Sequence, residues 1–95
     1  MAGEEPILNA LKNAVEHTHN CSARLVRLDW VSDQHDSQVL WQGEVAVFEI
    51  RAPHTKAKHC YAWSHGAPPL ITTILELPPV DSAQSAVKVG SHLQG

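Results

Sequence analysis

The sequence predicts one α+β domain, with an N-terminal helix, an antiparallel meander of three or four strands and a C-terminal helix (α-β-β-β-β-α). Val39–Arg51 is the longest run of strand-forming residues, and amphipathic stretches with helical spacing lie near both ends of the chain. A length of 95 residues leaves room for a single core over residues 1–95. Both helices are expected on one face of the sheet, because antiparallel sheets tolerate an open second face. Residues 1–5 and 94–95 are expected to fray.

The first helix is expected over Pro6–His17. Proline suits the first turn of a helix, and the acidic residues Glu4 and Glu5 complement the positive end of the helix dipole. The apolar stripe of this helix consists of Ile7, Leu8, Leu11, Ala14, Val15 and Thr18. The helix should stop near Asn20, since asparagine tolerates the left-handed conformation that ends helices.

The first two strands are expected over Cys21–Val31 and Val39–Arg51, joined by the polar stretch Ser32–Ser37. In the second strand the apolar positions change parity after Val47. This change predicts a bulge or a strong twist near residues 47 and 48. Gly43 lacks a side chain and leaves room for a large ring, for which Trp30 and Trp63 are the candidates.

The segment Ala57–His65 fits either a strand or a short helix, and we favour the strand because Tyr61 and Trp63 suit a pleated surface. A turn at residues 66–69 leads to a strand over Leu70–Leu77, which Pro78 and Pro79 end. Asp81 then opens the second helix, with Gln84 three residues later as in a capping box.

Charge and composition exclude several function classes. The formal net charge of −3 disfavours general nucleic-acid binding. The sequence contains no apolar run of 18 residues, so no membrane span is expected. The acidic start of the chain lacks the features of a signal peptide, which favours the cytoplasm. In that compartment Cys21 and Cys60 are expected as free thiols.

One alternative function is a metal-binding or redox-sensitive module built on His17, His19 and Cys21. Imidazole and thiolate are the ligands that zinc and copper prefer. Three such groups at alternate positions could converge on one ion if the backbone were extended. The spacing matches no established structural zinc pattern, however, and histidines near a helix end also suit the helix dipole in the absence of metal.

A second alternative rests on the N-terminal helix with Pro6, Leu8 and Leu11, on His35, and on the basic segment Lys56-Ala57-Lys58 after a long strand. Over about residues 6–65 this arrangement resembles a double-stranded-RNA-binding domain, a family with a helix, three strands and a second helix. The resemblance implies phosphate contacts from the lysines. The chain departs from the family: residues 51–55 contain no glycine, the lysine pair is interrupted, and a further strand and helix follow.

Catalysis lacks a supporting motif. The sequence contains no phosphate-binding glycine-rich loop, no Gly-x-Ser-x-Gly and no His-Glu-x-x-His. Cys60 lies beside His59, but neighbouring side chains on a strand point to opposite faces and form no dyad. A non-enzymatic role is therefore favoured, with no cofactor.

The favoured function is that of a protein-interaction or accessory module. It would act through the open sheet face or the loop at residues 51–58, and its partner would be another protein or a second copy of the chain in a homodimer. The candidate contact residues are Trp41, Trp63, Arg51, His54, Lys56 and Lys58.

Overall fold

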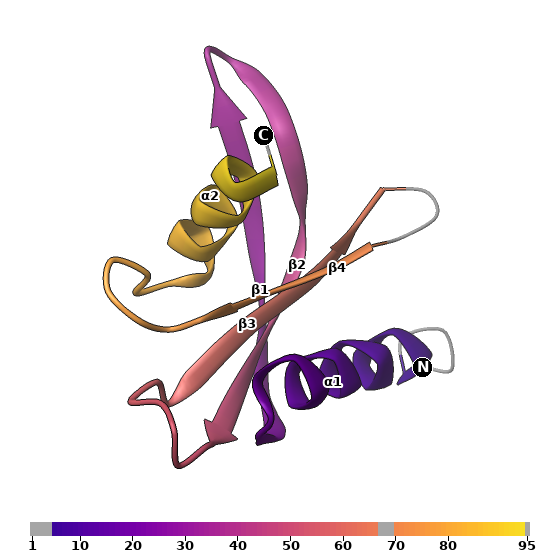
Figure 1. Ribbon diagram of the computed structural model, residues 1–95. Helices are drawn as coiled ribbons and strands as arrows, with labels where there is room; N and C mark the ends of the chain where they lie inside the picture. Colours follow the sequence, from indigo (N-terminus) through magenta and orange to yellow (C-terminus); the bar gives the residue numbers. More distant parts are fainter. Residues whose placement is uncertain (1–4, 67–69, 95) are drawn as a thin grey trace.

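The computed structural model in Figure 1 describes residues 5–66 and 70–94. Its elements are α1 (Glu5–His19), β1 (Ser22–His35), β2 (Gln38–Arg51), β3 (His59–His65), β4 (Leu70–Leu75) and α2 (Ala83–Gln94). The predicted α-β-β-β-β-α order is confirmed, and residues 59–65 form a strand rather than a helix. Of the ends predicted to fray, residues 1–4 and 95 lie outside the described residues, whereas residues 5 and 94 belong to helices. Neither described helix has the length and apolarity to cross a membrane.

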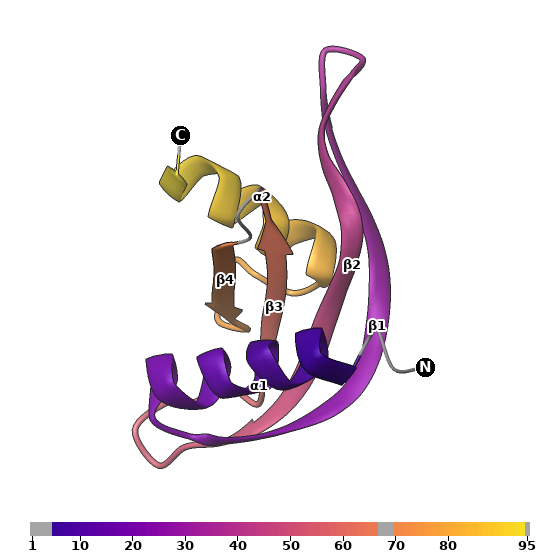
Figure 2. The same ribbon diagram turned by 90° about the vertical axis from the view of Figure 1, so that its right-hand side faces the viewer.

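The four strands form one antiparallel meander in the order β1-β2-β3-β4. The hairpin of β1 and β2 is much longer than the rest of the sheet and extends beyond it as an arm (Figure 2). Its turn consists of Asp36 and Ser37, both at positive φ (51° and 68°), as a tight two-residue hairpin requires. Most of the predicted polar connection at residues 32–37 is therefore strand.

The hairpin has two irregularities, and the first lies where the sequence predicted one. The pairing of β1 with β2 shifts between Leu25 and Arg27, which pair with Phe48 and Val47, and again between Asp33 and Gln34. The extra residue at the first shift is Val26 on β1, so the bulge predicted near residues 47 and 48 lies on the partner strand rather than on β2 itself. The space beside Gly43 is filled by Trp41 of the same strand, whose ring lies 2.9 Å from where a Cβ atom would stand.

The two helices cover opposite faces of the sheet, which corrects the prediction that both lie on one face. In Figure 1 the β3–β4 hairpin runs between α1 and α2. Side chains of β2 with even numbers pack against α1 in a cluster that includes Leu11, Val15, Ala46, Phe48, Ile50 and Cys60. Side chains of β2 with odd numbers pack against α2 in a cluster that includes Val45, Val47, Tyr61, Trp63, Ala86 and Val87. The parity change in the sequence thus reflects burial on both faces.

The start of α2 differs in detail from the predicted capping box. The hydroxyl of Ser82 accepts a hydrogen bond from the backbone amide of Ser85 at 3.2 Å, so Ser82 is the capping residue instead of Asp81. Gln84, the predicted partner of the box, reaches away from the helix to the carbonyl oxygen of Ser32 on β1 at 3.1 Å. The end of α1 follows the prediction, because Asn20 adopts a left-handed conformation with φ of 50°.

Candidate functional site

An apolar groove lies between the first turns of α1 and the β1–β2 hairpin. Helix α1 covers the end of the sheet around Phe48 and leaves Leu28 and Trp30 of β1 beside it uncovered. The groove has a volume of about 320 Å³. Its lining consists of Ile7, Leu8, Leu11, Leu28, Trp30, Trp41, Gln42, Gly43, Glu44 and Ser64, and we call it the α1 groove.

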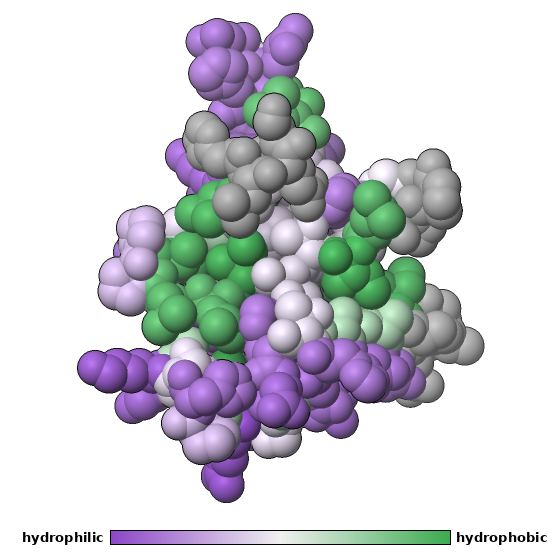
Figure 3. Space-filling model, in the orientation of Figure 1, coloured by the Kyte–Doolittle hydropathy of each residue, from purple (hydrophilic) through white to green (hydrophobic). Residues whose placement is uncertain are grey.

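Trp30 is the most exposed large hydrophobic side chain among the described residues, with 66% of its surface accessible to solvent. It lies on the rim of the α1 groove, next to Leu28, which is 38% exposed. Exposed apolar residues occur elsewhere singly or in pairs, such as Leu70 and Ile71 on β4. Figure 3 shows hydrophobic surface over α2 and at the end of the β3–β4 hairpin, while the outer side of α1 is hydrophilic.

The tryptophans predicted as contact residues have different environments. Trp63 is only 4% exposed and belongs to the core beneath α2. Trp41 is half-buried, with its ring centroid 6.2 Å from that of Trp63, and its ring also reaches the α1 groove. Trp30 was absent from the predicted contact set. Its parity with Val26 and Leu28 indicated an apolar face of β1, but only the position of α1 shows that this part of the face is left uncovered.

The predicted basic residues lie at the other end of β2 from Trp41, around the loop that leads to β3. Arg51, Lys56 and Lys58 are exposed there. His54 is also exposed, and its Nε2 donates a hydrogen bond to the carbonyl oxygen of His19 at 2.8 Å, which ties the loop to the end of α1. The structure therefore does not join the loop and the tryptophans into one surface.

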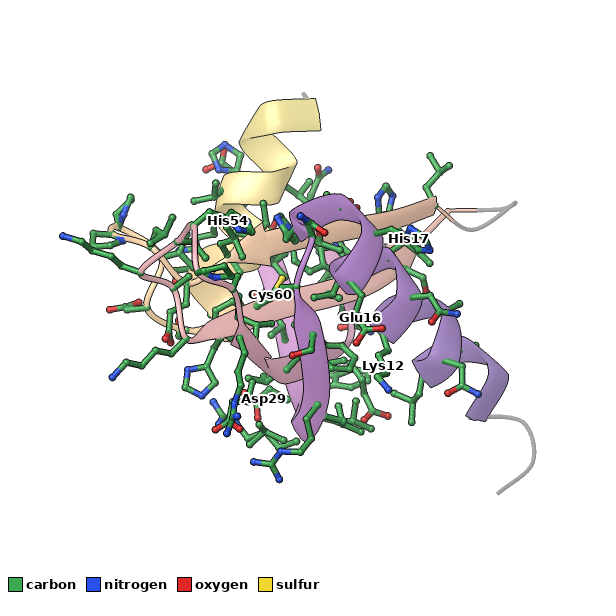
Figure 4. The ribbon with its side chains drawn as sticks, turned by 60° about the horizontal axis from the view of Figure 1, so that its bottom comes forward. Lys12, Glu16, His17, Asp29, His54 and Cys60 are labelled. Atoms are coloured by element: carbon green, nitrogen blue, oxygen red, sulfur yellow. The ribbon has the colours of Figure 1, made fainter. Side chains whose placement is uncertain are left out.

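The three residues predicted as metal ligands do not converge. His17 is exposed on α1, and Figure 4 shows it far from the Cys60 side chain. The Nε2 atom of His19 is hydrogen-bonded to Thr73 Oγ1 at 2.8 Å, and the thiol of Cys21 points to the carbonyl oxygen of Val15 at 3.8 Å. Within the described part of the chain, no group of three or more His, Cys, Asp or Glu residues could hold a metal ion.

The chemistry of the thiols also gives a metal or redox site little support. Burial, together with the nearby carboxylate of Glu16, raises the pKa of Cys21. Burial raises the pKa of Cys60 to about 12. Both groups are thus held as thiols at neutral pH, whereas the thiolate is the form that binds metals and reacts with oxidants.

A polar cluster that sequence reasoning missed joins β3 to the residue after β4. The hydroxyl of Tyr61 donates to Glu76 Oε2 at 2.8 Å, and His59 Nδ1 donates to Glu76 Oε1 at 3.0 Å. Burial raises the pKa of Glu76, but the two donors outweigh it, so the pKa is lowered overall. Burial and the Glu76 carboxylate raise the pKa of Tyr61. The cluster ties two strands together with charge-assisted hydrogen bonds.

The shared parity of His59 and Tyr61 on a strand could have indicated that they lie on one face. The sequence contained no signal that Glu76 would lie between their polar atoms, because that contact depends on the register of β4 against β3. Comparison with known proteins adds no analogy: no family model, no curated protein and no solved structure matches this chain.

Proposed function

We propose that this protein is a non-catalytic interaction module that binds a protein partner through the α1 groove and Trp30. The observation that carries the proposal is the exposure of Trp30 on the rim of an apolar groove. Tryptophan is enriched among the residues that dominate binding energy at protein interfaces, and it contributes most when a partner desolvates its ring. Leu28 and Ile7 add exposed apolar surface to the lining of the same groove.

The free cysteines support a reducing compartment such as the cytoplasm as the place of this interaction. Neither Cys21 nor Cys60 forms a disulfide bond in the structure. Their raised pKa values keep them as thiols, which oxidise slowly. The other candidate functions have less support from the chain. The predicted metal ligands are dispersed, and a net charge of −3 gives little of the counterion release that drives RNA binding.

Site-specific photo-crosslinking tests the proposal. A photoreactive phenylalanine analogue replaces Trp30 in one sample and Lys88, an exposed residue of α2, in a matched control. After irradiation in an extract of the organism that encodes the chain, position 30 should give discrete protein adducts, including adducts with the chain itself, that position 88 does not give. Excess unlabelled wild-type protein should suppress these adducts, whereas a Trp30→Glu variant should not.

The proposal is wrong if positions 30 and 88 give the same adducts. It is also wrong if the wild-type protein and the Trp30→Glu variant compete equally well. A thermal denaturation curve of each variant confirms that the domain is folded before the comparison is made. Because Trp30 is mostly exposed, its replacement should change the midpoint little.

A further inference from the structure

Strand β1 forms one edge of the sheet, and its two ends are protected by side chains from the two helices. The Oε2 atom of Glu16 on α1 accepts a hydrogen bond from the backbone amide of Ala23 at 2.9 Å. Gln84 on α2 donates to the carbonyl oxygen of Ser32 at 3.1 Å. Such side-chain caps occupy edge groups that could otherwise pair with another chain.

The stretch between these two caps is open. Over residues 24–31 the described part of the chain places no further side-chain hydrogen bond on the backbone of β1. The pairing with β2 is regular from Arg27 to Asp33, so alternate residues direct their backbone groups toward β2 and away from it. The carbonyl group of Ser32 meets Gln84 on the outer side, and therefore Leu28 and Trp30 also direct their backbone groups outward.

We infer that this stretch pairs with the same stretch of a second copy, so that two β1 strands run antiparallel about Leu28. This inference rests on the proposed function and names its partner. A free edge with exposed apolar side chains is a template for strand addition. The open stretch ends at Ala23 and Ser32, and Leu28 lies within one residue of its middle.

The charges of β1 favour this register over the registers centred on the two neighbouring residues. Pairing about Leu28 places Arg27 of each copy opposite Asp29 of the other, which gives two pairs of opposite charge. Pairing about Arg27 would place two arginines opposite each other, and pairing about Asp29 would place two aspartates opposite each other. These positions are non-hydrogen-bonded pairs, in which the side chains come closest, so like charges there are the most unfavourable.

The same register gathers the apolar side chains. A two-fold axis between antiparallel strands stands perpendicular to the sheet, so the α1 faces of both copies lie on the same side. Leu28 then meets its counterpart, and Trp30 of each copy lies on the same face at the end of the paired stretch. The caps and the register shift at Val26 keep the paired stretch short, and an interface of less than about 1,200 Å² is typical of weak association.

Sedimentation velocity from about 1 µM to about 500 µM, a range that brackets weak interfaces, tests the inference. The wild-type protein should pass from monomer to dimer within this range. Arg27→Asp and Asp29→Arg each replace two attractive pairs with two repulsive ones and should raise the Kd about 10-fold or more. Lys88→Asp, which changes the net charge as much as Arg27→Asp but lies on α2, should leave the Kd unchanged.

An equimolar mixture of the two single variants gives the decisive result. In a mixed dimer the two substituted residues lie opposite each other with opposite charges. The native Arg27 of one variant lies opposite the native Asp29 of the other. Dimerisation should therefore return to the wild-type Kd. The ion pair between Arg27 and Asp29 within one chain, 3.0 Å long, is lost in both variants and is not restored by mixing. Recovery in the mixture therefore reports contacts between copies rather than repair of the fold.

Three results would overturn the inference: a wild-type monomer at every concentration, single variants that dimerise like the Lys88→Asp control, or a mixture that dimerises no better than its components. These failures are distinct from failure of the proposed function. A monomeric chain that still gives adducts with another protein from position 30 would refute self-pairing and leave the interaction module intact. A chain without specific adducts at position 30 would refute both.

Discussion

Replacing Gly90 with alanine tests how firmly α2 is seated on the sheet. A Cβ atom at this position would lie 2.8 Å from Cζ2 and 3.0 Å from Cη2 of Trp63, distances that force one of the two elements to move. Alanine in the interior of a helix is favoured over glycine by about 1 kcal/mol. Overpacking of a core costs about 1–3 kcal/mol. Trp63 is 4% exposed and lies against Trp41, so we expect the overpacking cost to exceed the helix gain.

The expected net effect of Gly90→Ala is a loss of about 1 kcal/mol in the free energy of unfolding, or about 4–8 °C in Tm for a domain of this size. Chemical and thermal denaturation followed by circular dichroism measures both quantities. The control is the same change in a Trp63→Phe background, because the shorter phenyl ring lacks the two carbons that clash. There Gly90→Ala should stabilise the protein by up to about 1 kcal/mol. Equal stabilisation in both backgrounds would refute the reasoning.

The remaining predictions concern the α1 cluster, the polar cluster and the thiols. Phe48→Ala should lower the free energy of unfolding by about 3–5 kcal/mol in denaturant titrations, because the ring is 1% exposed; a loss below about 1 kcal/mol would contradict this packing. The lowered pKa of Glu76 contributes stability that is complete above the ordinary value of 4.5 and is lost as the pH falls through the lower folded-state value. Glu76→Gln should therefore have a smaller free energy of unfolding than wild type near neutral pH, and this difference should shrink in acid. A difference that does not change with pH would argue against the two hydrogen-bond donors. Cys60, with its pKa of about 12, should react with iodoacetamide only on unfolding and more slowly than Cys21; labelling of the native protein at equal rates would show that the α1 cluster opens readily.

Local patterns predicted the elements well, because each depends on neighbours within a few residues. The spacing of Leu8, Leu11 and Val15 suffices for α1, and Asn20 ends it as its conformational preference indicates. The element boundaries shifted where side chains from distant segments decided them. Polar residues such as Ser32 and Asp33 looked like a loop, yet they extend β1 because β2 pairs with them throughout.

The placement of the helices was not predictable by the same means. The apolar run from Val45 to Phe48 was interpreted as a bulge or a strong twist, whereas in the structure it also reflects burial on both faces, and the two causes give the same sequence pattern. The candidate site depended on this placement. Whether Trp30 or Trp63 is exposed follows from which end of which face each helix covers, and that depends on the long-range packing of α1 and α2.

The projecting hairpin arm has a consequence for the exchange of backbone amide hydrogens with solvent. On β2 the pairing with β3 spans only Ala46–Glu49, so residues 38–45, except Leu40, pair with β1 alone. Two isolated strands are marginally stable in water, and the tip of the arm around residues 34–40 opens without disruption of either core, whereas Val45 belongs to the core beneath α2. Deuterium should therefore enter the arm around Asp36 first and reach the amides of residues 46–49 last, as an ordered gradient along a single strand.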